Sequence, residues 1–438
     1  MALRRARDRL GSKGVCAEPV VFEVDCIEEP LMTTSPIRIG VDATTWSNDR
    51  GFGRFTRELL IALVARQSEF RYTLVFDRPP AATWPIPEGV DVIHAATDKS
   101  LNESAVGDSA RSLGYLWKMG KLVRGARFDL FFYPAVYSYF PVLARVPCVV
   151  CYHDTTAERI PHLLFPTKLN HRLWQAKTWL AKLQTTRAMT VSETSARDME
   201  SYLGISRHRI DLVTEAADPT FRKTDDPALV AAARERSGIP AGADLLVYVG
   251  GMNTHKNILG LLKAMPEIVA QRPNVHLAIV GSTSGKGFWD NVPELMAFVR
   301  DTPPLDRHVT FTGYLPDQEL VHLFGSTAAL VFPSLWEGFG LPAVEAMSCG
   351  VPVLSSDRGS LPEVVADAGL YFDPESRSEI VSTVLKFLSP GTDRAKLSQA
   401  ALRRSKDFSW DRAAELAEES FRRCLGGRAS DSKQQTSP

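Results

Sequence analysis

The sequence has no excess of charge of either sign: Lys and Arg together number 51, Asp and Glu also number 51, and the formal net charge is zero. Binding nucleic acid through a broad face needs a surplus of Lys and Arg, so nucleic acid is not an expected partner. Long apolar runs are also missing, and no stretch approaches the ~20 apolar residues that cross a bilayer. The basic start, MALRRAR, has no apolar core after it, which argues against a secretory signal. We therefore expect a cytoplasmic protein.

Cysteine is scarce, with six in 438 residues, and this number does not suggest a disulfide framework. Cys148 and Cys151 have the spacing of a redox or zinc pair. They lie inside an apolar run, however, and no second CxxC supplies further zinc ligands. We interpret them as small buried side chains of a strand.

Both ends of the chain, residues 1–36 and 426–438, are polar and lack periodicity, which predicts mobile extensions. Between them, short apolar runs alternate with helical patterns, as in α/β proteins with parallel sheets. The first series of predicted strands covers residues 37–41, 72–76, 90–94, 130–133, 148–153, 188–191 and 210–213. After a polar link at about 223–243, a second series covers residues 245–249, 276–280, 309–312, 329–332, 353–355 and 370–372.

These two series predict two Rossmann-like domains, 37–222 and 223–408, whose parallel sheets face a central cleft. A last helix, 409–425, is expected to return to the amino-terminal domain. Ligands of such folds bind at the carboxyl ends of the strands. The segments that follow strands are therefore the first place to look for chemistry.

Residues 333–352, PSLWEGFGLPAVEAMSCGVP, follow one predicted strand and enter a helix. Pro342 suits the first helical position, where an N–H would have no partner. The N–H groups at such a helix start form an anion site, and here they belong to Phe339, Gly340 and Leu341. Glu337 on the loop and Glu345 in the first helical turn could accept hydrogen bonds from the hydroxyl groups of one bound molecule. Alone, the segment is more typical of a tight strand–helix connection with one surface glutamate and one capping glutamate.

A second segment, residues 249–257 (VGGMNTHKN), also follows a predicted strand and opens a helix. Gly250 and Gly251 permit close approach of a ligand, and Lys256 would neutralise a diphosphate. The segment is not a Walker A motif, so triphosphate hydrolysis loses support. An intact GxGxxG is missing too, which weakens a nicotinamide or flavin interpretation.

In this order and spacing, the two segments resemble the retaining glycosyltransferases of family 4, which have the GT-B fold. The likeness covers roughly residues 37–425, and its most specific part is the E-x7-E motif, Glu337 to Glu345. The resemblance implies that Glu345 binds the nucleotide ribose and that Glu337 faces the donor sugar. It also implies that the amides of residues 339–341 hold sugar and phosphate, and that Lys256 binds phosphate. The residue before this lysine is often arginine in the family but is His255 here, which is mostly neutral at pH 7.

Further positions match the family. Gly313 and Tyr314 match the stretch whose backbone contacts the base. Gly53 and Arg54, in the segment RGFGRFT that begins at residue 50, match a Gly-rich loop beside the donor phosphates and the acceptor. His153, after a predicted strand, matches a histidine that reaches the donor sugar. The resemblance thus implies Glu337, His153 and Lys256 as catalytic residues, and the other positions as donor-binding residues.

No D-x-D triplet occurs in the sequence, so we expect no metal site and no cofactor beyond the nucleoside diphosphate sugar itself. The resemblance implies transfer of a hexose, with mannose favoured, to a glycan or lipid-linked acceptor in polysaccharide or glycolipid synthesis. A non-catalytic nucleotide-sugar binder, an epimerase and a phosphorylase remain alternatives. A basic series, Lys118, Lys121, Arg124 and Arg127, leaves peripheral contact with the inner membrane face open, although such series more often form solvated faces.

Overall fold

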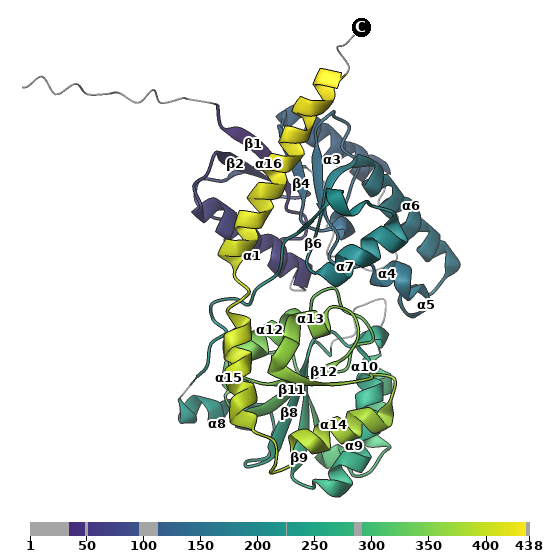
Figure 1. The fold of residues 1–438 in the computed structure, drawn as a ribbon, viewed down its shortest axis with the longest axis vertical. Helices are drawn as coiled ribbons and strands as arrows, with labels where there is room; N and C mark the ends of the chain where they lie inside the picture. The colour runs from purple at the N-terminus through teal and green to yellow at the C-terminus, as the bar shows by residue number, and fades with distance from the viewer. Residues whose placement is uncertain (1–34, 49–50, 96–112, 225, 284–290, 435–438) are drawn as a thin grey trace, which may run out of the picture. The chain divides into compact units, whose positions relative to one another are not determined.

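The computed structural model describes residues 35–48, 51–95, 113–224, 226–283 and 291–434, without the side chains of 113 and 427–434. The predicted extension 1–36 lies almost wholly outside the described residues. Residues 37–438 form one unit that contains two parallel sheets, as the alternating pattern predicted (Figure 1). The α/β fold class is therefore confirmed.

The first sheet has seven strands in the order β3-β2-β1-β4-β5-β6-β7. Its strands are β1 (Ile37–Asp42), β2 (Phe70–Phe76), β3 (Asp91–His94), β4 (Leu130–Tyr133), β5 (Cys148–Cys151), β6 (Thr185–Thr190) and β7 (Ile210–Leu212). The helices of this half are α1 (Gly51–Ala65), α3 (Leu113–Ala126), α4 (Thr156–Arg159), α5 (Pro161–Leu164), α6 (Lys168–Gln184) and α7 (Glu193–Asp198), which continues as a π-helical turn (Met199–Leu203).

The second sheet has six strands in the order β10-β9-β8-β11-β12-β13. Its strands are β8 (Asp244–Val249), β9 (Val275–Val280), β10 (Val309–Gly313), β11 (Thr327–Phe332), β12 (Val353–Ser356) and β13 (Gly369–Phe372). The helices of this half are α8 (Pro227–Arg236), α9 (Ile258–Gln271), α10 (Val292–Arg300), α11 (Asp317–Phe324), α12 (Leu341–Ser348), α13 (Leu361–Val365), α14 (Arg377–Phe387), α15 (Arg394–Ser405) and α16 (Trp410–Gln434).

The central strands β4, β5 and β6 send alternate side chains into two different cores. Phe132 and Val149 belong to the core that α1 and α16 cover, which continues into the second half of the chain. Phe131 and Val150 belong to a separate core that Met119 of α3 and other residues of α3 and α6 cover. The centre of the sheet is buried on both faces, and this explains why strands such as β4 and β5 are continuous apolar runs.

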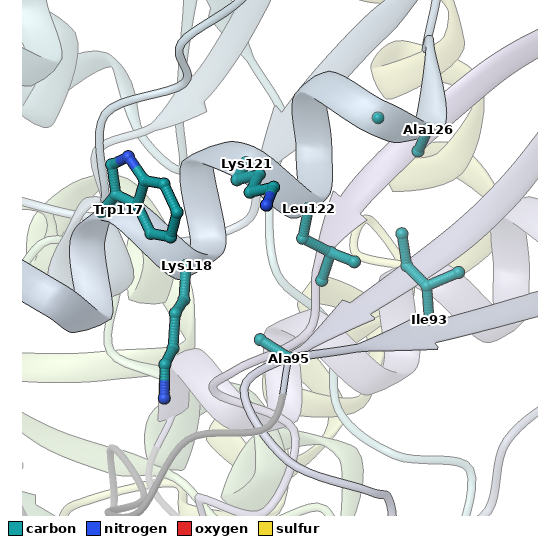
Figure 2. Close-up of a pocket in the computed structure, with 8 residues that line it drawn as sticks. Ile93, Ala95, Trp117, Lys118, Lys121, Leu122 and Ala126 are labelled. Atoms are coloured by element: carbon teal, nitrogen blue, oxygen red, sulfur yellow. The ribbon is translucent and has the colours of Figure 1, made fainter.

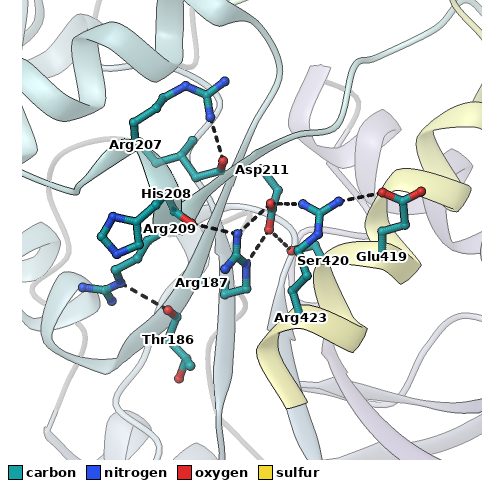
Figure 3. Close-up of polar contacts among 10 residues, drawn as sticks. Thr186, Arg187, Arg207, His208, Arg209, Asp211, Glu419, Ser420 and Arg423 are labelled. Atoms are coloured by element: carbon teal, nitrogen blue, oxygen red, sulfur yellow. Dashed lines mark hydrogen bonds and ion pairs between the residues drawn. The ribbon is translucent and has the colours of Figure 1, made fainter. Parts of the chain in front are cut away.

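Helix α16 packs along α1 and reaches β5, β6 and β7 of the first sheet (Figure 1). One buried carboxylate ties it there: Asp211 on β7 accepts hydrogen bonds from Arg187 Nε at 2.7 Å and from Ser420 Oγ at 2.7 Å (Figure 3). Arg423 forms an ion pair with the same carboxylate. Burial by itself would raise the pKa of Asp211, but these partners outweigh it and hold the pKa below its ordinary value. Helix α16 is thus fastened to the first sheet.

Several sequence-based boundaries were wrong. The Gly-rich stretch beginning at residue 51 is the first turn of α1, not a loop, so Arg54 is helical. The polar link contains α8, and the stretch after β13 forms two helices. Helix α14 buries an apolar face that includes Ile380 and Val384, and α15 packs through the small residues Ala400 and Ala401. Helix α16 runs to Gln434, beyond its expected end at 424–425.

Chain order reverses at one place in each sheet, between β1 and β4 and between β8 and β11. Ligands of open α/β sheets bind beyond the carboxyl ends of the strands at such reversals. The loops that carry Gly250 and Glu337 follow β8 and β11, which pair directly. The fold therefore brings the two motif segments to one edge of the second sheet. Among the described residues, no helix is both long and apolar enough to cross a membrane.

Candidate active site

Lys256 and Glu337 form the centre of the site. The Lys256 Nζ lies 2.6 Å from Glu337 Oε1 and 2.8 Å from Oε2, and both side chains are largely buried. Burial would raise the pKa of Glu337, but the charge of Lys256 outweighs it and holds the pKa below its ordinary value. The structure thus joins the two sequence motifs through a carboxylate that stays ionised and an ammonium group.

The glycine loop after β8 has the conformation that its residues suggest. Gly250 has φ +148°, and its carbonyl oxygen approaches Gly281 so closely that a Cβ there would lie 2.1 Å away. Tyr248 Oη donates a hydrogen bond to the Gly251 carbonyl at 2.6 Å, which fixes the loop. Asn257, with φ +54°, then starts α9. The loop leads from the strand into a helix start, as an anion-binding segment requires.

His255 contributes a backbone hydrogen bond to the site and no charge. Its carbonyl oxygen accepts the N–H of Leu335 at 2.8 Å, so it holds the start of the loop that carries Glu337. Burial, with the neighbouring Lys256, lowers the pKa of His255 to about 4, which leaves the ring neutral at pH 7. Lys256 is therefore the charged member of this pair.

Glu345 lies in the second turn of α12, since the helix begins at Leu341 and Pro342 is its second residue; the expected first-turn position was wrong. Arg54 Nη1 donates to Glu345 Oε1 at 2.6 Å, and Nη2 contacts both oxygens of Asp317 at 2.7 Å. Burial raises the pKa of Glu345 to about 7, and Arg54 partly opposes that shift. The guanidinium therefore occupies the oxygen that ribose hydroxyls are expected to contact.

Arg54 was predicted beside the donor phosphates, and the structure instead places it against Glu345 and Asp317, over the ring of Phe221 at 5.6 Å. Gly53 packs against main-chain carbonyls, and a Cβ there would lie 2.0 Å from the Asn48 oxygen. This contact gives Gly53 a packing reason to be glycine. The donor-binding assignment of both residues stays a prediction.

His153 has a protein partner at each ring nitrogen. Nδ1 lies 3.0 Å from Glu215 Oε1, and Nε2 lies 2.9 Å from the Pro134 carbonyl oxygen. Burial opposes the charged ring, but Cys151 and Glu215 favour it and raise the pKa of His153 well above its ordinary value. An imidazolium donates both N–H groups to these acceptors. Both ring nitrogens of His153 are thus occupied by acceptors within the protein.

Gly338 lies where the two halves of the chain touch. A Cβ on it would lie 2.2 Å from the His153 carbonyl oxygen and 2.7 Å from Asp154 Cβ. Ser192 Oγ donates to the Gly338 carbonyl at 2.7 Å, and Ser195 Oγ donates to it at 3.1 Å. These contacts hold the loop that carries Glu337 against the backbone of His153. Two of the predicted catalytic residues therefore lie on backbone segments that contact each other.

The remaining predicted donor residues flank this centre. Gly340, with φ +103°, caps α12, and Phe339 and Leu341 are buried on either side of it. Ser360 Oγ donates to the Phe339 carbonyl at 2.8 Å and so fixes this stretch. Gly313, with φ +75°, ends β10 and is followed by Tyr314, which is 63% exposed. The donor-binding roles of these residues stay predictions.

Sequence reasoning missed several residues of the site. They are the carboxylates Asp317 and Glu215, which pair with Arg54 and His153, and Glu363, which accepts the N–H groups of Glu193 and Thr194 across the two halves. Among the described residues, no cluster of three or more His, Cys, Asp or Glu side chains is arranged to hold a metal. A separate hollow of about 600 Å³, between α3 and β3, has none of the predicted site residues in its lining (Figure 2).

Family models match both halves of the chain. The model described as Glycosyltransferase Family 4 matches residues 50–221, and the one described as Glycosyl transferases group 1 matches residues 230–404. O-antigen chain mannosyltransferase B of Escherichia coli is 37% identical over 165 residues, which is 38% of this chain and 42% of that relative. The segments matched in the first curated relatives cover between 28% and 54% of their lengths, so the chain spans about half of them or less.

Solved structures share the fold. Sucrose-phosphate synthase from Thermosynechococcus elongatus has a TM-score of 0.69 at 18% identity, over 89% of this chain and 100% of that one. The HepE protein of Anabaena in complex with UDP-glucose has a TM-score of 0.66 at 20% identity, over 87% and 98%. Both family models match, and the chain has the two parallel sheets and the two paired motifs that this family implies. The chain belongs to the family 4 glycosyltransferases with the GT-B fold.

Proposed function

We propose that the protein is a retaining glycosyltransferase that moves a hexose, mannose in the first instance, from a nucleoside diphosphate sugar to a glycan or lipid-linked acceptor. The observation that carries this proposal is the pairing of Lys256 with Glu337 beyond β8 and β11. A cation and a carboxylate at one strand edge provide for both charges that develop when a glycosidic phosphate bond breaks.

In this proposal the nucleotide lies along the edge of the second sheet. Glu345 accepts hydrogen bonds from the ribose after Arg54 gives up its contact with that carboxylate, and Asp317 keeps the guanidinium in place. Lys256 and the N–H groups at the starts of α9 and α12 hold the diphosphate. The backbone of Gly313 and Tyr314 meets the base.

The transfer breaks the bond between the anomeric carbon and the diphosphate oxygen and forms a bond from that carbon to the acceptor oxygen. The acceptor hydroxyl gives its proton to the departing diphosphate, which leaves with the bonding electron pair. Lys256 stabilises the negative charge of the leaving group, and Glu337 stabilises the positive charge on the sugar. The residues present can supply the leaving-group stabilisation without a metal.

Support for mannose comes from the named relative, an O-antigen chain mannosyltransferase, and support for a nucleotide donor comes from the UDP-glucose complex of the HepE fold relative. The O-antigen mannosyltransferase also favours a polysaccharide or glycolipid as the product.

A donor screen tests the proposal. The full chain is heated with GDP-mannose, UDP-glucose, UDP-galactose and ADP-glucose, and the matching donor should raise the midpoint by roughly 3 °C or more at saturation. That donor is then supplied with mannoside and lipid-linked acceptors, and release of the nucleoside diphosphate and the anomeric configuration of the product are measured by NMR. An inverted product excludes retention. A donor that stabilises the chain without transfer to any acceptor favours a non-catalytic binder.

A further inference from the structure

Helix α6 carries an apolar stripe that faces solvent. Leu169, Leu173, Leu180 and Leu183 are 65%, 52%, 41% and 62% exposed, and Ala176 between them is exposed too. Their spacing of four, three, four and three residues places them on one side of the helix, over about 21 Å. An amphipathic helix normally turns such a stripe to the core. In α6 the fully buried residues are instead Thr178 and Ala181, on the opposite side.

The flank of this stripe is basic. The helix contains Lys168, Arg172, Lys177 and Lys182 and no acidic residue. Among the described residues, no carboxylate forms an ion pair with Lys168, Arg172 or Lys182. Trp179, which is 58% exposed, lies on the same flank as Lys168 and Arg172. We call this surface the α6 face, and it consists of Lys168, Leu169, Arg172, Leu173, Trp179, Leu180, Lys182 and Leu183.

The neighbouring surface has the same character. Helix α3 covers the same core as α6, and α1 and α16 cover the opposite one, so both helices look outward from one side of the first sheet (Figure 1). Trp117 of α3 is 58% exposed, with Lys121 Nζ 5.1 Å from its ring centre (Figure 2). Leu143, 50% exposed, lies against Gly120, and Gln184 at the end of α6 bonds the adjacent Val142. The segment at 142–143 thus connects α3 to α6.

We propose that the α6 face docks on an anionic lipid bilayer. Exposed leucines can enter the boundary between headgroups and acyl chains, tryptophan favours that boundary, and lysine and arginine pair with anionic headgroups. A second copy of the chain fits less well, because it would set one basic flank against another. Five basic or histidine side chains among the 17 residues of α6 keep the helix on the surface of the bilayer and not across it.

Vesicle flotation of the full chain tests this proposal and needs no sugar donor, so it is independent of the proposed transfer. The protein should float with phosphatidylcholine vesicles that contain phosphatidylglycerol, float far less with phosphatidylcholine alone, and be released as salt rises. Leu173→Gln with Leu180→Gln should weaken binding roughly tenfold or more. Lys168→Gln, Arg172→Gln and Lys182→Gln together should weaken it about 100-fold and remove the preference for anionic lipid.

Matched controls use exposed residues elsewhere. Leu229→Gln on α8 controls for the leucine change, and Lys263→Gln with Lys386→Gln and Lys396→Gln controls for the loss of three charges. Circular dichroism melting verifies that each variant folds. Equal flotation with both kinds of vesicle, or α6 variants that bind as tightly as their controls, would overturn the proposal. Light scattering that shows a dimer lost in the leucine variant, with vesicle binding unchanged, would assign the face to self-association instead.

Discussion

Arg54 and Glu345, separated by 291 positions in the chain, form a 2.6 Å ion pair between α1 of the first half and α12 of the second. The same guanidinium binds Asp317 through its other nitrogen. These pairs neutralise the charged groups of the site, so a nucleotide that binds Glu345 as proposed would have to displace Arg54 from a carboxylate oxygen. A diphosphate that binds Lys256 as proposed would have to share this cation with Glu337.

Replacing Lys256 with methionine should weaken binding of the bare nucleoside diphosphate by about 10- to 150-fold, since a charge-assisted contact contributes roughly 1.5–3 kcal/mol. Turnover should fall further, because the leaving group loses its cation. Calorimetry and steady-state kinetics measure the two effects. Lys263→Met, on the exposed side of α9, is the control. Unchanged diphosphate affinity in Lys256→Met would place the phosphate site elsewhere.

Nucleotide binding should depend on pH through Glu345. Burial raises the pKa of Glu345 to about 7, so the carboxylate form that accepts ribose hydroxyls predominates above pH 7 and is lost below it. Affinity should therefore fall up to about tenfold for each pH unit below 7. Calorimetric titrations between pH 6 and 8.5 measure this slope. Protonation of the nucleotide phosphates also changes affinity with pH, and it does so equally in the wild type and in Glu345→Gln, which serves as the control. The affinity of the wild type should therefore depend more steeply on pH than that of the variant. Equal slopes, or a steeper slope in the variant, would contradict the role of Glu345.

Gly338→Ala should destabilise the protein by about 1–3 kcal/mol, because the new Cβ would lie 2.2 Å from the His153 carbonyl oxygen and force the Glu337 loop away. Activity should fall more than stability alone explains. Urea unfolding gives the free energy of unfolding. Gly391→Ala, where a Cβ meets nothing within 4 Å, should stay within about 0.5 kcal/mol of wild type. Equal free energies of unfolding of the two variants would show that the Glu337 loop can move away from His153 without loss of stability.

Treatment with EDTA should leave most of the transfer activity, because Lys256 and helix N–H groups can stabilise the diphosphate and the sequence has no D-x-D triplet. Initial rates before and after chelation, with Mg²⁺ or Mn²⁺ added back, measure the effect. Complete loss that only added metal restores would show that a metal binds the leaving group.

Most strands could be predicted from the sequence, but the side chains that contact the site residues could not. Leu130–Tyr133 begins and ends where its apolar run predicted, since a strand buried on both faces must be apolar throughout. Helix α15 was not predicted, because it packs through Ala400 and Ala401 without a strong apolar pattern. Helix α14 was not predicted either, although its buried residues Ile380, Val381, Val384 and Phe387 have helical spacing. The motifs located Glu337, Glu345 and Lys256. The contact of Arg54 with Glu345 depends on how the two halves pack, and that of His153 with Glu215 depends on how the segments after β5 and β7 come together in the first half. No local pattern encodes either contact.

The central claim is that Glu337 stabilises the charge on the sugar and Glu345 binds the ribose of the nucleotide. One paired measurement tests this division of roles most directly. Steady-state kinetics and calorimetry of the bare nucleoside diphosphate are compared for Glu337→Gln and Glu345→Gln. Glu337→Gln should lower kcat without weakening diphosphate binding, because Glu337 acts on the sugar as charge develops there and its loss leaves Lys256 available to the diphosphate. Glu345→Gln should raise the donor KM and weaken every nucleotide ligand alike. Equal losses of diphosphate binding would contradict the division of roles, and wild-type rates in both variants would contradict the proposed transfer reaction.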